Sequence, residues 1–435
     1  MRTNLLFALM LAPLLLAACD KRTSGDTAGD VDAIAERYVH LVLGVGEIDA
    51  GYVDAYYGPA EWRTAVAEEQ ADTETLLERA HDVREQLAAI PQAEEKLSTL
   101  RQEYLAKQLD ALIAYLEILG GRELSFDAEA QALYDTQPPH FDDAHFEAIL
   151  EEIDALVPGA GPLAERVENF RREFIIPPER LAAVFEAAMT ECRTRTLTHL
   201  PLPVQEDFSI EYVTDKPWSG YNWYQGDAKS LIQVNTDLPI FLDRAVELGC
   251  HEGYPGHHTY NALLESKLVK QRGWIEFTVY PLFSPQSLIA EGSANYGVEL
   301  AFPGDEQLAF ERDVLAPLAG IDSNQLDEYA ALRAKLRQLD YAGNEAARAY
   351  LDGNADREQT ISWLVKYALY SPERAAQRVK FFDTYRSYVI NYNLGRDLVR
   401  EYVESNAGTH AERWKVFAEL LSSPRLPSGL NASDE

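Results

Sequence analysis

The residues of this chain that most clearly suggest chemistry lie in the stretch CHEGYPGHHTY. His251 and Glu252 begin this stretch as the zinc-peptidase motif H-E-x-x-H begins. In that motif two histidines one helical turn apart bind one zinc ion, and the glutamate accepts a proton from the zinc-bound water. Here Pro255 stands where the second histidine is expected, and His257 and His258 follow it.

An unbroken α-helix would not bring these histidines to one metal ion. His257 would lie about 240° around the helix axis from His251, and His258 about 10 Å along it. Pro255 and Gly256 favour a bulge, because proline removes a backbone donor and glycine adopts conformations that other residues avoid. A bulge restores the ordinary spacing with His257 as second ligand, although the choice between His257 and His258 stays open. The alternative is a surface turn in which the histidines cap a helix end.

A catalytic zinc site usually has three protein ligands and one open position. Glu291 begins the helix-like run EGSANYGVELA, and a glutamate from the next long helix completes sites of the gluzincin type. Considered without the two histidines, Glu291 has an alternative interpretation of equal weight: an acidic residue that the helix dipole stabilises at a helix N-terminus. Glu299 lies about two turns further along the axis, too far to replace it easily. We therefore expect His251, His257 and Glu291 to hold one zinc ion, with Glu252 as general base.

Helical periodicity dominates the elements that must position this site. Apolar residues at three- and four-residue spacings predict one helix over 97–119 and another after Pro178. A third helix is predicted over 371–402, where a capping serine precedes a proline. The aromatic-rich segment 208–235 alternates and contains turn residues, which predicts a small antiparallel sheet. The expected fold is mainly α: a large helical bundle with a deep cleft and a small antiparallel β-sheet next to the metal-binding helix.

The N-terminus has the pattern of an exported lipoprotein. Residues 1–18 contain Arg2, a short apolar run and small residues, and LAAC before Asp20 resembles the bacterial lipobox, whose cysteine carries the lipid. We expect lipidated Cys19 to anchor the protein to a membrane on the periplasmic side of the cell envelope, since several acyl chains give stable anchoring. A plain secretory signal with a chance cysteine is the alternative.

Composition indicates a globular protein with an acidic surface. Hydrophobic residues make up 46% and charged residues 25% of the 435 residues. The formal charge of -32 repels phosphate backbones, which excludes nucleic acid as a natural partner. The expected organisation is a flexible tether over 19–30, an N-terminal helical lobe over 31–160, a catalytic region over 161–421 and a polar tail over 422–435.

Two further cysteines, Cys192 and Cys250, do not amount to a disulfide framework in a chain of this length. We expect both to be buried core residues and do not expect them to pair.

Three segments resemble a bacterial family called domain of unknown function 885, whose members are helical, often lipoproteins, and similar to zinc carboxypeptidases and oligopeptidases. They read HEGYPGHH from His251, EGSANY from Glu291 and NYNLGR from Asn391. The first reproduces the family motif H-E-x-x-P-G-H-H in full. The second departs from the usual E-G-W-A-L-Y at Ser293 and Asn295, which keeps the ligand but changes the lining of the pocket.

The resemblance implies a zinc hydrolase that acts on peptide bonds. By position, Tyr392 would hydrogen-bond the developing oxyanion, His258 would contact the substrate or support the ligands, and Arg396 would bind a substrate carboxylate. Tyr392 is equally an aromatic core residue, and Arg396 equally a surface ion-pair partner.

The leading hypothesis is a zinc-dependent hydrolase, tethered to the cell envelope, that cleaves peptide bonds in short peptides. The alternative is a non-catalytic envelope lipoprotein that binds peptides or metal. An intact Glu252 favours the enzyme, because a general base adds little to mere binding. The sequence predicts neither the end from which peptides are cut nor the oligomeric state.

Overall fold

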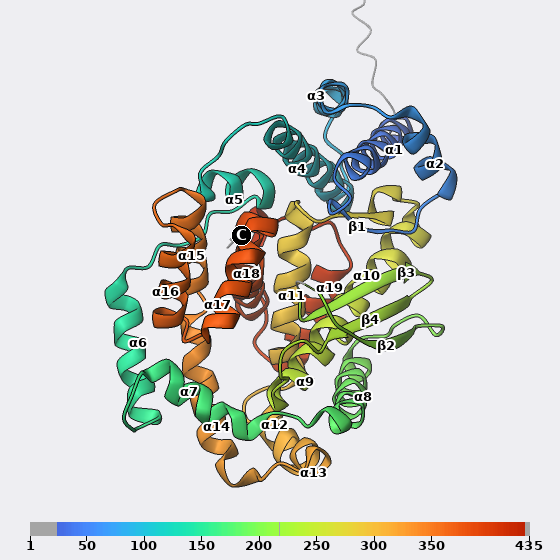
Figure 1. Ribbon diagram of the computed structural model, residues 1–435. Coiled ribbons are helices and arrows are strands. Elements are labelled where there is room, and N and C mark those ends of the chain that lie inside the picture. Colours follow the sequence, from blue (N-terminus) through green and yellow to red (C-terminus); the bar gives the residue numbers. More distant parts are fainter. Residues whose placement is uncertain (1–23, 217, 431–435) are drawn as a thin grey trace, which may run out of the picture.

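The computed structural model describes residues 24–216 and 218–430 and confirms a mainly α fold (Figure 1). The predicted signal peptide, the lipidation residue Cys19 and residues 19–23 of the predicted tether lie outside the described residues, whereas residues 24–30 form the beginning of α1 and are not the flexible tether that the sequence predicted. Within the described ranges, no helix has the length and apolar character that crossing a bilayer requires.

The first part of the described chain consists of helices and one short strand. These elements are α1 Ser24–Ile48, β1 Val53–Tyr56, α2 Ala60–Glu69, α3 Thr73–Ala89, α4 Lys96–Leu119, α5 Phe126–Tyr134, α6 Asp143–Leu156, α7 Leu163–Arg171 and α8 Leu181–His199.

The second part begins with a small sheet and continues with helices. Its elements are β2 Asp207–Val213, β3 Gly220–Gly226, β4 Lys229–Asn235, α9 Leu242–Leu248, α10 His257–Leu264, β5 Val279–Pro281, α11 Pro285–Ala301, α12 Glu306–Phe310, α13 Ala316–Ala319, α14 Leu326–Leu336, α15 Ala342–Leu351, α16 Arg357–Tyr367, α17 Pro372–Tyr385, α18 Ile390–Ser405 and α19 His410–Leu421.

The predicted helices form, with one difference. The helix expected over 371–402 begins as predicted, since Ser371 Oγ accepts a hydrogen bond from the Arg374 backbone N–H and Pro372 occupies the first helical position. It does not continue to the predicted end. Arg386 adopts a positive φ of 50°, which stops α17, and α18 starts at Ile390 after a short 3₁₀ turn over Arg386–Val389.

The sheet over the predicted segment is mixed rather than antiparallel throughout. The strand order is β2-β4-β3: β3 pairs with β4 antiparallel, whereas β2 pairs with β4 in parallel. Alternation in the sequence indicates strands but not their order. Here β4 lies between β2 and β3, the two strands that precede it in the sequence, and it runs parallel to β2 and antiparallel to β3. A second, two-stranded antiparallel pair joins β1 to β5.

One continuous cluster of buried side chains includes residues of both predicted segments, 31–160 and 161–421. Polar contacts cross the same boundary. The buried guanidinium of Arg101 on α4 forms two bonds of 2.5 and 2.9 Å with the carboxylate of Glu276. The N-terminal helices therefore pack directly against the part of the chain that carries the metal-binding motif.

Helices α11 and α18 approach each other as closely as only glycine permits. A Cβ added to Gly292 would lie 2.4 Å from the carbonyl carbon of Gly395, and one added to Gly395 would lie 2.7 Å from the carbonyl oxygen of Leu288. The two helices lie side by side in the middle of the molecule (Figure 1). This contact places the side chains of α18, including Tyr392, beside Glu291 on α11.

Cys192 and Cys250 form a disulfide bond, which corrects the expectation that they stay unpaired. Both are fully buried, as predicted. Their Cα atoms are 5.4 Å apart because α8 packs against the turn that follows α9, although the two residues are separated by 58 positions in sequence. The disulfide fixes the residue immediately before His251 to a neighbouring helix.

Replacing both cysteines with alanine should lower the free energy of unfolding by about 2–4 kcal/mol, because the bond closes a loop of 58 residues in the unfolded chain. Denaturant titrations of the wild type with and without reductant, and of the double variant, measure this. Equal unfolding midpoints in all three, with no cross-linked peptide in a non-reducing digest, would contradict the assignment.

Candidate metal centre

The helix that carries the motif is interrupted, as its proline and glycine predict. Helix α9 runs into a π-helical turn over Gly249–Gly253, which holds His251 and Glu252. The chain then leaves the helical path, and α10 begins at His257. The interruption is larger than the predicted bulge, because the two histidines lie on separate helical segments.

Gly256 makes this interruption possible. Its backbone N–H donates a 3.0 Å hydrogen bond to the carbonyl of Cys250, so the chain turns back over the end of the π-helical turn. A Cβ at Gly256 would lie 1.7 Å from the carbonyl oxygen of His251, a distance that no other residue type tolerates. The return of the backbone brings the ring of His257 perpendicular to that of His251, with 4.7 Å between the ring centroids.

His251, His257 and Glu291 come together as a possible metal site. His251 Nε2 lies 3.1 Å from His257 Nε2 and 3.1 Å from Glu291 Oε2, and the third distance, from His257 Nε2 to Glu291 Oε2, is 3.7 Å. Tetrahedral bonds of about 2.0–2.1 Å to zinc would place ligand atoms about 3.3 Å apart. The three atoms are therefore spaced as ligands of a single ion of this size would be.

Asn295 fixes the orientation of His251. The Asn295 side-chain amide donates a 2.9 Å hydrogen bond to the carbonyl of Tyr392, so its oxygen faces the Nδ1 atom of His251 at 2.9 Å. Nδ1 then carries a ring proton, and Nε2 points at the cluster. Asn295 is one of the two departures from the family pattern, and sequence reasoning assigned it to the pocket lining rather than to this role.

Tyr388 holds the carboxylate of Glu291. Its phenol donates a 2.8 Å hydrogen bond to Oε1, which leaves Oε2 to face the two histidines. Glu291 lies inside α11, which begins at Pro285, so the alternative of an acid at a helix N-terminus does not apply. Sequence reasoning missed Tyr388, and its only signal was the tyrosine-rich segment that contains Tyr392.

The charges of the cluster act on one another. Burial opposes ionisation of Glu291, but its hydrogen bonds with His251 and His257 hold the pKa of its carboxyl well below the usual range. Burial likewise lowers the pKa of His251, but the hydrogen bond with Glu291 and the charges of Glu252 and Glu291 raise that pKa to about 9. The cluster therefore favours a charged carboxylate at its centre.

Glu252 has a different environment from Glu291. Its Oε2 atom is buried without a hydrogen-bond partner. Burial and the charge of Glu291 raise the pKa of the Glu252 carboxyl, although the charges of His251 and His257 act to lower it. Asn222 on β3 donates a 2.6 Å hydrogen bond to the backbone carbonyl of Glu252, which fixes the main chain. Gly220 leaves room for the side chain, since a Cβ there would lie 2.8 Å from Oε1.

His258 faces away from the cluster. Its side chain is fully buried, with Nδ1 2.8 Å from Ser230 Oγ and Nε2 3.3 Å from Glu206 Oε2. Both of its ring nitrogens are occupied, so His257 and not His258 is the candidate second ligand. The structure does not bring His258 to a position from which it reaches a substrate at the cluster.

Tyr392 and Arg396 have separate surroundings. The Tyr392 ring lies 5.8 Å from the ring of Tyr388, whose hydroxyl bonds Glu291, and burial and the charge of Glu291 raise the pKa of the Tyr392 phenol well above its usual value. Arg396 is paired instead with Asp340 and Asp397, each at 3.2 Å. The structure therefore does not offer the Arg396 guanidinium to a substrate carboxylate.

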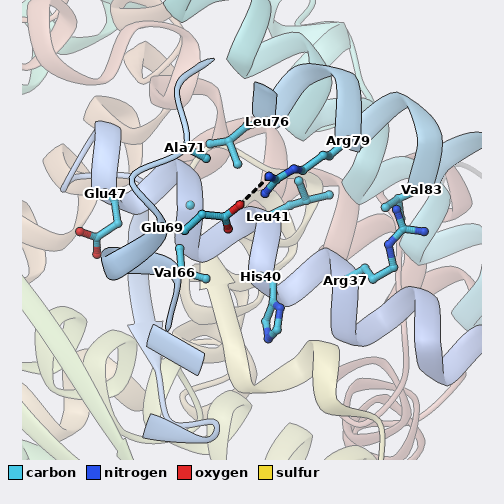
Figure 2. Close-up of a pocket in the computed structure, with 11 residues that line it drawn as sticks. Arg37, His40, Leu41, Glu47, Val66, Glu69, Ala71, Leu76, Arg79 and Val83 are labelled. Carbon is cyan, nitrogen blue, oxygen red and sulfur yellow. Dashed lines mark hydrogen bonds and ion pairs between the residues drawn. The ribbon is translucent and has the colours of Figure 1, made fainter. Parts of the chain in front are cut away.

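Two surface cavities lie in the N-terminal part of the chain, away from the cluster. A shallow one is lined by four residues around His140 and His145. The other, of about 170 Å³, lies between α1, α2 and α3 beside the ion pair of Glu69 and Arg79, and Figure 2 shows its mixture of charged and apolar side chains. Neither cavity contains a predicted site residue.

No family model and no curated protein matches the chain. A "putative lipoprotein" from Colwellia psychrerythraea is similar in structure, with 14% identity and a TM-score of 0.48 over 83% of this chain. This chain spans 66% of that one. A chain described as "BsuCP Crystal Structure" has 10% identity and a TM-score of 0.42, over 92% of this chain and 88% of that one.

A "putative lipoprotein of unknown function" from Shewanella oneidensis has 12% identity and a TM-score of 0.41, over 82% of this chain and 75% of that one. Similarity at this level assigns no function to this chain. Membership of the family that the motifs resemble therefore stays a prediction.

His257→Ala should weaken zinc binding by more than about 100-fold, because it removes a ligand. Loss of a residue that only hydrogen-bonds a ligand weakens metal affinity by about 10–100-fold, and loss of the ligand itself should cost more. His258→Gln should keep zinc, because the two ring nitrogens of His258 are occupied by Ser230 and Glu206. Metal analysis after loading with one equivalent of zinc and desalting measures both. Zinc lost from the His258 variant and kept by the His257 variant would reverse the ligand assignment.

Asn295→Ala should weaken zinc binding by about 10–100-fold, because the His251 ring loses the acceptor that fixes its tautomer. Ser293→Ala is the matched control on the same helix, since the Ser293 hydroxyl donates to the backbone carbonyl of Ala290 and not to a residue of the candidate site. Competition with a chromophoric chelator measures both affinities. Equal affinities in the two variants would show that Asn295 does not support the ligand.

Proposed function

We propose that this chain is a zinc-dependent hydrolase that cleaves peptide bonds in short peptides. The observation that supports the proposal most strongly is the buried, unpartnered Oε2 atom of Glu252 beside the three-residue cluster. Leaving a buried carboxylate oxygen without a partner costs stability, so its retention next to a metal site favours a catalytic use. A protein that only binds metal has no need of this group.

His251, His257 and Glu291 would hold the ion, which supplies a Lewis acid for the scissile carbonyl and lowers the pKa of a water molecule. Glu252 accepts the proton of the attacking water and passes it to the leaving amine. The raised pKa of the Glu252 carboxyl suits both transfers, because a group whose pKa is closer to the working pH is both a better proton acceptor and still able to donate.

Tyr392 is the proposed donor to the carbonyl oxygen of the substrate as negative charge develops there. Its elevated pKa keeps the phenol protonated and able to donate. Tyr388 is less suited to this role, because its hydroxyl already donates to Glu291.

The proposed location is the periplasmic side of a bacterial envelope, with a lipid on Cys19 as the membrane anchor. The Cys192–Cys250 disulfide supports an exported protein, because disulfides persist in oxidising compartments. The partner would be a peptide substrate. A non-catalytic lipoprotein that binds peptides or metal remains the alternative, and turnover separates the two.

Glu252→Gln should reduce peptide hydrolysis by about 10²–10⁴-fold while zinc binding is kept, because the amide cannot accept the proton of water. Glu299→Gln is the control on α11, since Glu299 pairs with Arg400 near the surface. Rates on a mixture of short peptides, with metal content measured in parallel, test this. Unchanged cleavage in the Glu252 variant would remove the proposed base, and no cleavage by zinc-loaded wild type would favour the binding protein.

A further inference from the structure

The turn between α17 and α18 has a strained backbone. Arg386, the first residue of this turn, has a φ of 50° and a ψ of -124°. These angles belong to the first central residue of a type II′ turn, which is normally glycine because a side chain crowds the backbone there. Such a conformation costs free energy and persists only where the surroundings of the residue fix it. Contacts with the rest of the protein must therefore hold this turn.

The carboxylate of Glu129, on α5, supplies such contacts. Its Oε1 atom accepts hydrogen bonds from the Ser387 backbone N–H at 3.1 Å and from the Ser387 hydroxyl at 2.6 Å. Its Oε2 atom accepts a 2.7 Å hydrogen bond from Arg386 Nε. Glu129 and Ser387 are both buried, so water competes little for these bonds. One carboxylate thus binds two consecutive residues of the strained turn.

The strained turn leads directly into the candidate metal centre. Tyr388 follows Ser387 in the chain, and its phenol donates the 2.8 Å hydrogen bond to Glu291. Helix α18 begins immediately after the turn, so Tyr392 lies about one helical turn beyond Tyr388, with 5.8 Å between the ring centroids. The backbone path at Arg386 therefore determines where both phenols lie.

Helix α5 contacts Tyr388 in a second way. The ring of Tyr134, which is fully buried on α5, meets the Tyr388 ring edge-on with 6.1 Å between the centroids. The same helix packs against the turn and against α11, which carries Glu291, and Figure 1 shows it at the upper end of α18. The N-terminal part of the chain thus reaches the metal centre through a residue that supports a ligand.

We propose that Glu129 is a positioning residue: by holding Arg386 in its strained conformation, it keeps Tyr388 and the start of α18 beside the metal centre. Without Glu129, the turn should relax towards a negative φ, because that removes the crowding at Arg386. The relaxation would withdraw the Tyr388 phenol from Glu291 and shift Tyr392. This inference rests on the proposed function for the role of Tyr392, whereas the support of Glu291 depends on metal binding alone.

The test asks whether glycine at position 386 replaces the contribution of Glu129. Glu129→Ala should weaken zinc binding by about 10–100-fold, the range for loss of a residue that supports a metal ligand. Combining Glu129→Ala with Arg386→Gly should restore the affinity to within about threefold of the wild type, because glycine adopts the turn without external contacts. Competition of the full-length proteins with a chromophoric chelator for zinc measures each affinity. Neither variant removes a metal ligand.

Two controls define the rescue. Arg386→Ala removes the same guanidinium but keeps a Cβ, so it should not restore the affinity of Glu129→Ala. Gln131→Ala, at an exposed position of α5, should leave the affinity unchanged. If Glu129→Ala does not fold, Glu129→Gln replaces it, because the amide keeps the size of the side chain and one oxygen for Ser387. The glutamine variant should show a smaller loss and the same rescue by glycine.

Three results would overturn the proposal. The first is equal zinc affinity in Glu129→Ala and the wild type. The second is a combined variant with Arg386→Gly that binds zinc no more tightly than Glu129→Ala alone. The third is equal rescue by Arg386→Ala and Arg386→Gly, which would show that an unpaired charge, and not the backbone conformation, causes the loss.

Turnover separates this inference from the proposed function. With a short peptide that the wild type cleaves, Glu129→Ala should lower kcat more than it raises KM, because Tyr392 is proposed to act on charge that develops in the transition state. A zinc-loaded wild type that cleaves no peptide, with the expected pattern of zinc affinities, keeps the positioning of Glu291 and loses the hydrolase function. Unchanged cleavage and zinc binding in Glu129→Ala keep the hydrolase function and lose the positioning role.

Discussion

The passage of the Gly256 backbone against the carbonyl of His251 is the contact on which the metal centre depends. A side chain at this position would overlap that carbonyl, with its Cβ only 1.7 Å from the oxygen. Because the backbone passes so closely, α10 begins where His257 can meet His251 at 3.1 Å between Nε2 atoms. On a continuous helix the same two rings would point in directions about 240° apart. The inserted proline and glycine thus redirect the second histidine towards the first and keep the candidate metal site together.

A second close contact completes the arrangement from the other side. Gly292 and Gly395 let α11 and α18 approach, and across this contact Asn295 reaches the carbonyl of Tyr392 while Tyr388 reaches Glu291. These hydrogen bonds orient one imidazole and one carboxylate towards a common point. The Oε2 atom of Glu252, next to this point, is buried without a hydrogen-bond partner.

The sequence predicted the parts of this centre that depend on local spacing. His251, Glu252 and Glu291 could be named because motif and helix periodicity are local signals, and the break at Gly256 because proline and glycine cannot continue a helix. The choice of His257 over His258 depends on how far the chain turns back, which spacing does not encode.

Contacts between segments that are far apart in the sequence could not be predicted either, because local spacing does not encode them. The Cys192–Cys250 pairing, the parallel placement of β2, and the supporting roles of Asn295 and Tyr388 follow from which helices pack together. Arg396 was a reasonable choice for a carboxylate from its place one turn after Tyr392. Only the packed structure shows that Asp340 and Asp397 balance its charge.

The central claim is that two imidazoles and one carboxylate, brought together by the turn at Gly256, bind a single cation. A crystal structure of the zinc-loaded protein, with anomalous data collected at the zinc absorption edge, tests it most directly. The account predicts one strong anomalous peak with His251 Nε2, His257 Nε2 and Glu291 Oε2 at about 2.0–2.2 Å. A peak bound by other residues, His258 among them, or the absence of any peak between these three side chains, would contradict it.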